Sequence, residues 1–132
     1  MRKPAIWLVS AGLWLLIGLV VSQGGTSVFA TLATAEIADA CVRAHVPVRC
    51  APAALRAVVA DSHIAGRVRP ARHVGSVDIF LEALERGTEG DVLVVDNAGR
   101  LDESCVGDLV ALEAQAAGLA GIVIWGLHRD TA

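Results

Sequence analysis

The 132-residue sequence has few aromatic residues, few charged residues and no run of basic side chains. Aromatic residues make up 4% of the chain and charged residues 19%, whereas 55% of the residues are hydrophobic. Ala, Val, Leu and Gly supply most of this apolar content, which favours closely packed α/β layers over a disordered chain. The net charge is −3 and no basic stripe is present, so we expect no nucleic-acid partner.

The sequence also lacks the common arrangements for zinc binding, phosphate binding and nucleophilic catalysis. Its three cysteines, Cys41, Cys50 and Cys105, match no zinc spacing and form no disulfide framework. We therefore expect buried or half-buried thiols and a reducing compartment. The histidines form no H-x-x-x-H pair, and no P-loop or nucleophilic triad is present.

Residues 1–30 form an apolar leader. Arg2 and Lys3 are its only charges, and an uncharged apolar run covers residues 5–21. This run lies at the lower limit for a membrane span and is long for a signal-peptide core. We expect an apolar N-terminal helix whose origin stays open between a membrane anchor, a signal, a misassigned start and a fusion. A genuine anchor would bring residues 5–21 into the membrane and, by the positive-inside rule, export the rest.

Residues 31–132 alternate between helical and strand patterns, which predicts an α/β domain. Pro47 is expected to stop the first helix, and Ser76 is a candidate N-cap for the second. The expected helices cover residues 34–44, 78–85 and 107–117. The expected strands cover residues 64–68, 91–96 and 121–125.

Residues 91–125 predict a βαβ unit with parallel strands and a right-handed crossover. Ligands of such sheets bind beyond the carboxyl ends of the strands. Three segments are expected at that edge: the loop 96–99, the helix start at 107–108 and the segment 126–130.

One set of residues at this edge could do chemistry. Asp108 opens the crossover helix, and Arg129 and Asp130 follow the second strand after twenty intervening residues. Two carboxylates beside a guanidinium suit Mg²⁺ or Mn²⁺ together with an anionic substrate. An N-terminal helix charge and a surface ion pair would explain the same residues without a site. Main-chain N–H groups near the helix start could also bind an anion; they belong to Val106, Gly107, Asp108 and Leu109.

From residue 34 to residue 132 the chain resembles the RraA-like family. That family includes 4-hydroxy-4-methyl-2-oxoglutarate aldolases, oxaloacetate decarboxylases and regulators of ribonuclease E activity. The most specific segment covers residues 107–130, where Asp108, Arg129 and Asp130 match the D-x20-R-D pattern of the catalytic branch. The other resembling segments are A-E-I-A-D-A (35–40), I-A-G-R-V (64–68), G-S-V-D-I-F-L-E-A-L-E (75–85) and G-D-V-L-V-V-D-N-A-G (90–99).

The resemblance implies a role for each residue of the D-x20-R-D pattern. Asp130 would contact the metal directly, and Asp108 would hold a metal-bound water and take part in proton transfer. Arg129 would bind the substrate carboxylate and stabilise a developing enolate. The implied function is a class II, divalent-metal-dependent lyase that cleaves or decarboxylates pyruvyl-containing 2-keto acids through a pyruvate enolate. The ribonuclease-regulator branch typically lacks the acid after the arginine, so Asp130 favours the lyase over the alternative, a protein-binding regulator.

The resemblance also implies a layered, swivelling β/β/α-type domain over residues 31–132, a homotrimer with sites between subunits, and a cytoplasmic location. Family members usually continue past the arginine-aspartate pair, and many have an acidic residue three positions later. We therefore expect an incomplete domain, truncated at its C-terminus, and an inactive remnant is a further alternative.

Three further groups of residues have two interpretations each. His128 either lines the pocket or is an ordinary edge residue. Asp96 and Asn97 either support the site or form a turn. The cluster of Arg67, Arg69 and Arg72 predicts a solvated strand edge or a subunit contact rather than a phosphate site.

Overall fold

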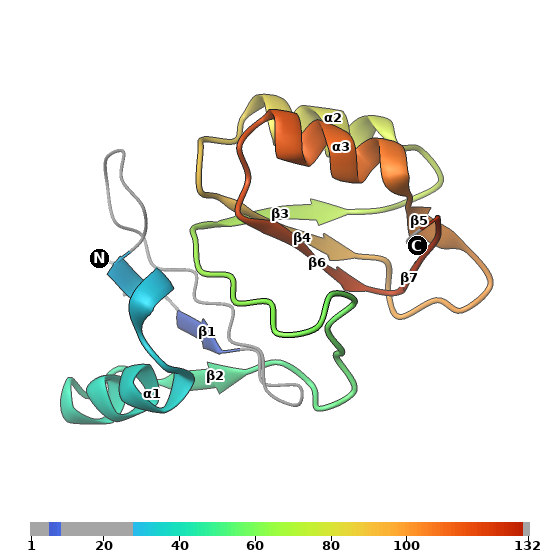
Figure 1. Ribbon diagram of the computed structural model, residues 1–132. Coiled ribbons are helices and arrows are strands. Elements are labelled where there is room, and N and C mark those ends of the chain that lie inside the picture. The colour runs from blue at the N-terminus through green and yellow to red at the C-terminus, as the bar shows by residue number, and fades with distance from the viewer. Residues whose placement is uncertain (1–5, 9–27, 131–132) are drawn as a thin grey trace. The chain divides into compact units, whose positions relative to one another are not determined.

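The structure is a computed structural model of the chain, and it describes residues 6–8 and 28–130 (Figure 1). The chain divides into two compact units, Met1–Arg67 and Val68–Ala132. Both units combine helices with parallel strands, which confirms the α/β class.

The described residues of the first unit form one short parallel strand pair and one α-helix. Ile37 and Cys41 are the buried residues of this helix, because side chains four positions apart share a face. Phe29, Ala38 and Val46 pack against them. The elements are β1 (Ile6–Leu8), the 3-10 helix η1 (Val28–Thr31), α1 (Thr34–Arg43) and β2 (Val48–Cys50), with β1 parallel to β2.

Main-chain geometry, and not Pro47, ends α1. His45 adopts a left-handed φ of 53°, and Val46 donates its N–H to the carbonyl of Cys41 at 2.9 Å. His45 donates to the carbonyl of Val42 at 3.1 Å. These two bonds form a Schellman C-cap, which closes the helix before the proline is reached.

The expected apolar helix over residues 5–21 falls mainly outside the described residues. Its three described residues, Ile6–Leu8, form strand β1 and not helix, with Ile6 opposite Val48 of β2. Among the helices in the described part of the chain, none is long and apolar enough to cross a membrane.

The second unit is built on a three-stranded parallel sheet with strand order β3-β4-β6. Val92 to Asp96 of β4 pair in register with Gly121 to Trp125 of β6, which confirms the predicted parallel βαβ unit. Figure 1 shows α2 and α3 together on one face of this sheet. The elements are β3 (Val68–Arg72), α2 (Asp78–Glu85), β4 (Val92–Asp96), α3 (Asp108–Ala116) and β6 (Gly121–Trp125).

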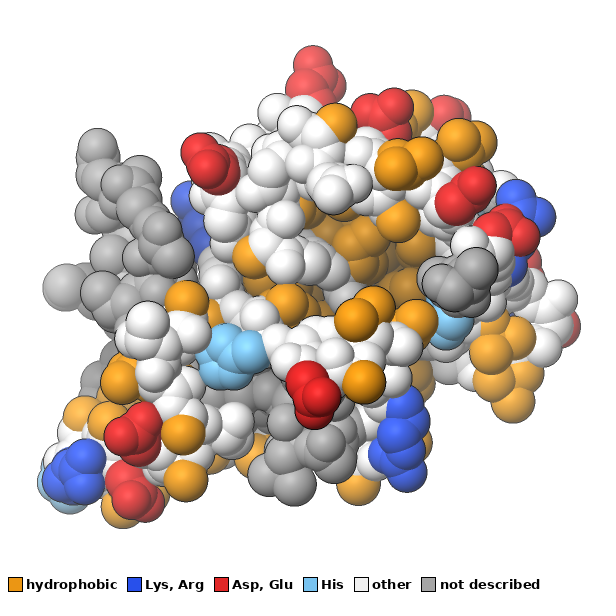
Figure 2. Space-filling view, viewed as in Figure 1, with side chains coloured by type: hydrophobic (Ala, Val, Ile, Leu, Met, Phe, Trp, Pro, Cys, Tyr) orange, Lys and Arg blue, Asp and Glu red, His pale blue; other side chains and the backbone are white. Residues whose placement is uncertain are grey.

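The core of this unit lies between the sheet and the two helices. Phe80 of α2 and Leu93 and Val95 of β4 are 0% exposed, and Ala114 is the one buried residue of α3. Full burial of each large apolar side chain contributes roughly 1.5–3 kcal/mol. The outer surface of the helices carries apolar and acidic side chains side by side (Figure 2).

The expected strand at residues 64–68 was placed too early in the sequence, because the strand forms at Val68–Arg72. Pro70 lies in the middle of this strand, and a proline removes one hydrogen-bond donor from a sheet. The strand tolerates it because β3 lies at the edge of the sheet, where β4 is its one partner among the described strands. The proline and two arginines in this segment hide the strand from a pattern of apolar residues.

The start of α2 partly confirms the expected cap. The first residue before the helix is Val77, not Ser76. Ser76 nevertheless accepts the N–H of Asp78 at 3.2 Å and donates its hydroxyl to the Asp78 carboxylate at 2.8 Å. Ser76 therefore satisfies one of the unpaired N–H groups of the first helical turn.

A buried ion pair holds the start of β4 to β3. Asp91 is 3% exposed and pairs with Arg69; it also accepts the N–H and the hydroxyl of Thr88 at 2.9 and 3.0 Å. Burial alone would raise the pKa of the Asp91 carboxyl. The hydrogen bonds from Arg69 and Thr88, together with the charge of Arg69, outweigh burial and lower this pKa below its ordinary value of 3.8.

We expect Asp91→Asn to destabilise the chain by on the order of 1–3 kcal/mol at neutral pH, because it removes a charged acceptor of three hydrogen bonds. A lowered folded-state pKa stabilises the fold above the unfolded pKa, and this stability is lost as the pH falls through the folded value. The difference between the two proteins should therefore shrink under acid conditions. Urea unfolding over a series of pH values measures it.

The control is Glu82→Gln, which breaks the exposed pair between Glu82 and Arg86. A solvent-exposed pair contributes less than about 1 kcal/mol, so this variant should unfold almost as the parent does. Equal effects of the two substitutions would contradict the assignment of Asp91 as a structural anchor.

Candidate functional site

A second, two-stranded parallel sheet lies beyond the carboxyl ends of the main strands. It pairs β5 (Ser104–Val106) with β7 (Leu127–His128), opposing Ser104 to Leu127 and Val106 to His128. Arg129 extends the pairing by donating its N–H to the carbonyl of Val106 at 2.9 Å. The sequence patterns predicted neither strand, because each is only two or three residues long.

The parallel pairing of β5 and β7 brings the predicted site residues together. β5 leads into Gly107, the residue before α3, and Asp108 follows as the first helical residue. β7 leads into Arg129 and Asp130. A Cβ placed on Gly107 would lie 3.2 Å from Asp130 Oδ2 and 3.3 Å from Arg129 Nε, so both side chains lie against this glycine.

Arg129 and Asp130 form an ion pair at this position, with 3.1 Å between Nε and Oδ2. Their side chains are 71% and 53% exposed, so solvent weakens the pair and leaves it accessible to a ligand. Asp130 has a left-handed φ of 59°, which aspartate tolerates better than most residues. Such backbone conformations are concentrated at functional sites.

At the start of α3, one of the main-chain N–H groups expected to bind an anion already has a partner. Asp108 accepts the N–H of Leu109 on its own Oδ1 at 2.7 Å, so this N–H already has a partner. The carbonyl of Val106 accepts from Arg129. The N–H of Leu109, one of the groups expected to bind an anion, therefore donates to the carboxylate of Asp108 instead.

Cys105 ties β5 to β7 from the buried side. Its thiol is 5% exposed and donates to the carbonyl of Leu127 at a sulfur–oxygen distance of 3.6 Å. Burial raises the pKa of the Cys105 thiol, so the sulfur keeps the proton that this contact requires. Among the other cysteines, Cys41 is buried as expected, whereas Cys50 is exposed.

The carboxylates of this site fit a hard divalent cation that keeps most of its water. Mg²⁺ is usually bound by one or two carboxylates, with water and substrate oxygens completing its coordination. Asp108 and Asp130 supply this number, and each has a second oxygen beyond the one in the contacts above. Within residues 6–8 and 28–130, no group of three or more His, Cys, Asp or Glu side chains could hold a metal. Two carboxylates are the ligand type that a hard, largely hydrated divalent cation takes.

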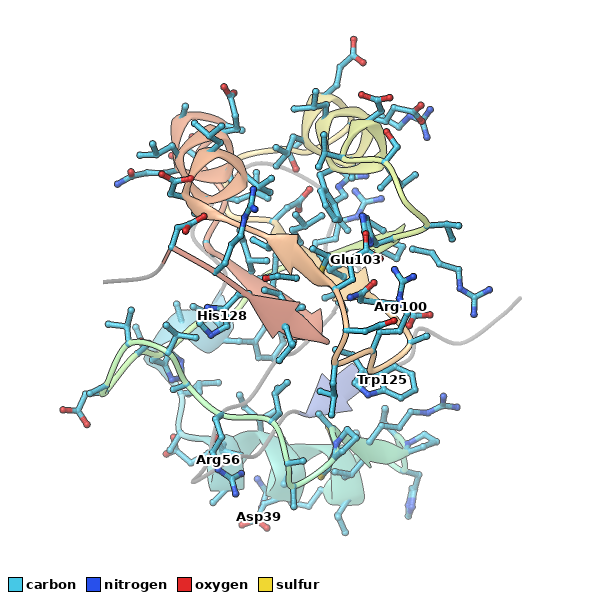
Figure 3. All side chains as sticks on the ribbon, turned by 90° about the vertical axis from the view of Figure 1, so that its right-hand side faces the viewer. Asp39, Arg56, Arg100, Glu103, Trp125 and His128 are labelled. Atoms are coloured by element: carbon cyan, nitrogen blue, oxygen red, sulfur yellow. The ribbon has the colours of Figure 1, made fainter. Side chains whose placement is uncertain are left out.

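The neighbouring candidates have structural partners. Asp96 accepts the N–H of Ala98 at 2.8 Å and pairs with Arg72 at 3.2 Å, so it forms the turn and the strand edge. Arg69 of the basic cluster pairs with Asp91. His128 is exposed on β7, and in the view of Figure 3 it lies on the opposite side of this edge from Arg100 and Glu103.

A buried polar cluster at the ends of β3 and β4 was missed by the sequence patterns. His73 and Asn97 are 5% and 0% exposed, and Arg100 and Glu103 contact them from the following loop. Of the four, only Asn97 was considered a candidate. The sequence places His73 far from the other three, and only the β3–β4 pairing brings it to them.

Together these features define an α/β domain with a parallel sheet and an Arg129–Asp130 ion pair beside the start of α3, beyond the carboxyl edge of the sheet. The model of the RraA-like family, described as Aldolase/RraA, matches residues 34–132, and the chain belongs to this family. The resemblance inferred from the sequence is thereby confirmed.

Curated proteins and solved structures similar to this chain include the following. A protein of Alkalilimnicola ehrlichii is 41% identical over 73 residues, which are 51% of this chain and 45% of the relative. A protein of Ectopseudomonas mendocina is 45% identical over 49 residues, which are 37% of this chain and 30% of the relative. Both carry the name of a 4-hydroxy-4-methyl-2-oxoglutarate aldolase. The chain thus spans less than half the length of either relative.

The solved structure is an uncharacterized protein from Pseudomonas syringae pv. tomato. It has a TM-score of 0.63 and 23% identity, over 86% of this chain and 55% of the other. At this identity the likeness supports the fold alone.

The close approach of Gly126 to Asn97 allows the packing at the carboxyl edge of the sheet to be tested. A Cβ at Gly126 would lie 2.7 Å from Asn97 Cβ, closer than two carbon atoms can pack. We expect Gly126→Ala to lower the free energy of unfolding by about 1–3 kcal/mol, measured by urea denaturation.

Gly107→Ala is the matched control, because its Cβ would meet only the exposed side chains of Arg129 and Asp130. Those ends can move, so this variant should lose less than about 1 kcal/mol. If Gly126→Ala unfolds no more easily than Gly107→Ala, the packing described at this edge is incorrect.

Proposed function

We propose that this chain is a divalent-metal-dependent lyase that cleaves or decarboxylates pyruvyl-containing 2-keto acids. The observation that carries the proposal is the Arg129–Asp130 pair packed against Gly107, the residue that immediately precedes Asp108. Membership of the RraA-like family and the aldolase names of two relatives support the same class of reaction.

Arg129 is proposed to bind and orient the substrate carboxylate. Its guanidinium has five N–H donors in a planar fork, and the contact with Asp130 uses only Nε. The remaining donors can form the paired hydrogen bonds that a carboxylate accepts. The same positive charge stabilises negative charge that develops on the pyruvyl group as the carbon–carbon bond breaks.

Asp130 and Asp108 are proposed to hold the cation, Asp130 directly and Asp108 through water. When bound, the cation supplies Lewis-acid polarisation of the 2-keto oxygen. The N–H of Leu109 donates to Oδ1 of Asp108 and orients its carboxylate. On the family resemblance, Asp108 is proposed to carry the proton that the reaction moves.

The activity, substrate and assembly of the whole protein are proposed from the family resemblance. The chain covers 45% and 30% of the two relatives, so the preferred acid and the assembly belong to the proposal. The resemblance suggests 4-hydroxy-4-methyl-2-oxoglutarate and oxaloacetate as substrates, and a cytoplasmic homotrimer. Residues 31–132 are proposed as the catalytic domain.

We expect the full chain with Mg²⁺ to release pyruvate from oxaloacetate or from 4-hydroxy-4-methyl-2-oxoglutarate, measured by enzymatic reduction of pyruvate to lactate. EDTA should abolish the release. Asp130→Asn and Arg129→Lys should each lower the rate by about 100-fold or more, since each removes a charge interaction with the reacting group.

Two controls accompany this measurement. Mg²⁺ without protein gives the background rate, because the metal alone decarboxylates oxaloacetate. Asp102→Asn removes one exposed negative charge from the loop before β5 and should retain the parent rate. Release that persists in Asp130→Asn, or no release from a folded chain, would contradict the lyase proposal; a metal-independent complex with ribonuclease E would then favour a regulator.

A further inference from the structure

The buried carboxamide of Asn97 contacts both segments that lead into the candidate site. Its side chain is 0% exposed at the end of β4, among His73, Arg100 and Glu103. Figure 3 shows Arg100 and Glu103 at this edge of the sheet. A buried amide has to satisfy its donors and its acceptor within the protein, so its partners determine its position.

The hydrogen-bond partners of Asn97 identify which atom of its carboxamide is Oδ1 and which is Nδ2. Arg100 approaches one atom with its NH2 group at 2.6 Å and its Nε at 3.2 Å, and an arginine can only donate. This atom is therefore Oδ1, and His73 Nδ1 lies 3.0 Å from it. The other atom is Nδ2, which donates to the main-chain carbonyl of Glu103 at 3.1 Å.

The bond from Nδ2 fixes the start of β5. Glu103 immediately precedes Ser104, the first residue of this strand. The hydroxyl of Ser104 is buried and has no hydrogen-bond partner within the part of the chain that the structure describes, so it does not hold the strand. The Nδ2 donor of Asn97 therefore supplies the side-chain anchor at the start of β5, which the hydroxyl of Ser104 does not supply.

The other side of Asn97 fixes the start of β7. Its main-chain N–H donates to the carbonyl of Trp125 at 3.1 Å, and its Cβ and amide lie against Gly126. Gly126 immediately precedes Leu127, the first residue of β7. A Cβ at position 126 would lie 2.7 Å from Asn97 Cβ, so glycine is what allows these two segments to approach so closely.

We propose that Asn97 is a positioning residue: it aligns β5 with β7 and thereby sets Asp108 against Arg129 and Asp130. The functional consequence of this alignment rests on the proposed function. The alignment itself can be measured without catalysis. Asparagine suits the position because aspartate would keep the acceptor for Arg100 and lose the donor to Glu103. Alanine would lose both.

Single-residue amide hydrogen exchange, followed by NMR on the full chain, tests the alignment. The reporter is the Arg129 N–H, which is bonded to Val106 across β5 and β7. We expect Asn97→Asp to accelerate its exchange by about tenfold or more, while the N–H groups of Val92–Asp96 in β4 keep their rates. Unchanged exchange at Arg129, or equal acceleration in β4, would overturn the proposal.

A second pair of variants keeps the test decisive if Asn97→Asp does not fold. Arg100→Met removes the donors that orient the carboxamide. Arg72→Met removes an exposed arginine that pairs with Asp96 at the same sheet edge and has no bond to Asn97. Only Arg100→Met should accelerate exchange at Arg129; equal behaviour of the two variants would count against the role of Asn97.

Binding of Mn²⁺ alone, measured by electron paramagnetic resonance, tests whether the alignment of β5 with β7 affects the proposed metal site. Residues that orient metal ligands typically change metal affinity by about 10–100-fold, and we expect Asn97→Asp to weaken Mn²⁺ binding within this range. If the parent chain binds no Mn²⁺, the proposed function fails, whereas the exchange result still decides whether Asn97 aligns the strands. Unchanged Mn²⁺ affinity in the variant, beside a parent that binds, would overturn the positioning role.

Discussion

Arg129 donates its main-chain N–H to the carbonyl of Val106, and the candidate site depends on this bond and on the short strand pair that it extends. Strand pairs of two or three residues are not stable alone, so β5 and β7 need support from the larger sheet. That support comes from the buried residues of β4, α2 and α3, and from contacts of Asn97 at both strand starts. The site is therefore an extension of the packed sheet and not a property of a free loop.

The interactions that stabilise this edge of the sheet are buried, whereas the proposed site residues are exposed. Two buried groups, Asp91 with Arg69 and Asn97 with its partners, have their hydrogen bonds satisfied. The exposed groups, Arg129 and Asp130, pair only weakly and can exchange their partner for a ligand. Ligand sites of parallel sheets occur beyond the carboxyl ends of the strands, where loops can carry reactive groups without disturbing the core.

Periodicity predicted the longer elements of the second unit well. The helix Asp78–Glu85 and the strand Gly121–Trp125 match their expected residues, because their apolar positions repeat with the spacing of a helix face and of a covered strand. β3 was misplaced because Pro70 interrupts its pattern. β5 and β7 were missed because their pairing, and not their composition, defines them.

The site was predictable only in part for the same reason. The βαβ pattern was sufficient to bring Asp108 to the edge that carries Arg129 and Asp130. The cluster around Asn97 requires His73 and Gly126 from two other strand ends, and no local pattern joins residues so far apart in sequence. The chemistry assigned to the three site residues stays a prediction.

Exchange of the methyl protons of pyruvate in D₂O would test the central claim most directly. A site that stabilises the pyruvate enolate should exchange these protons in the reverse half of its reaction, with no need for the full substrate. The account predicts loss of the methyl proton signal by NMR that requires both the chain and Mg²⁺ and disappears in Asp108→Asn. A folded chain that exchanges the methyl protons no faster than Mg²⁺ alone would contradict it.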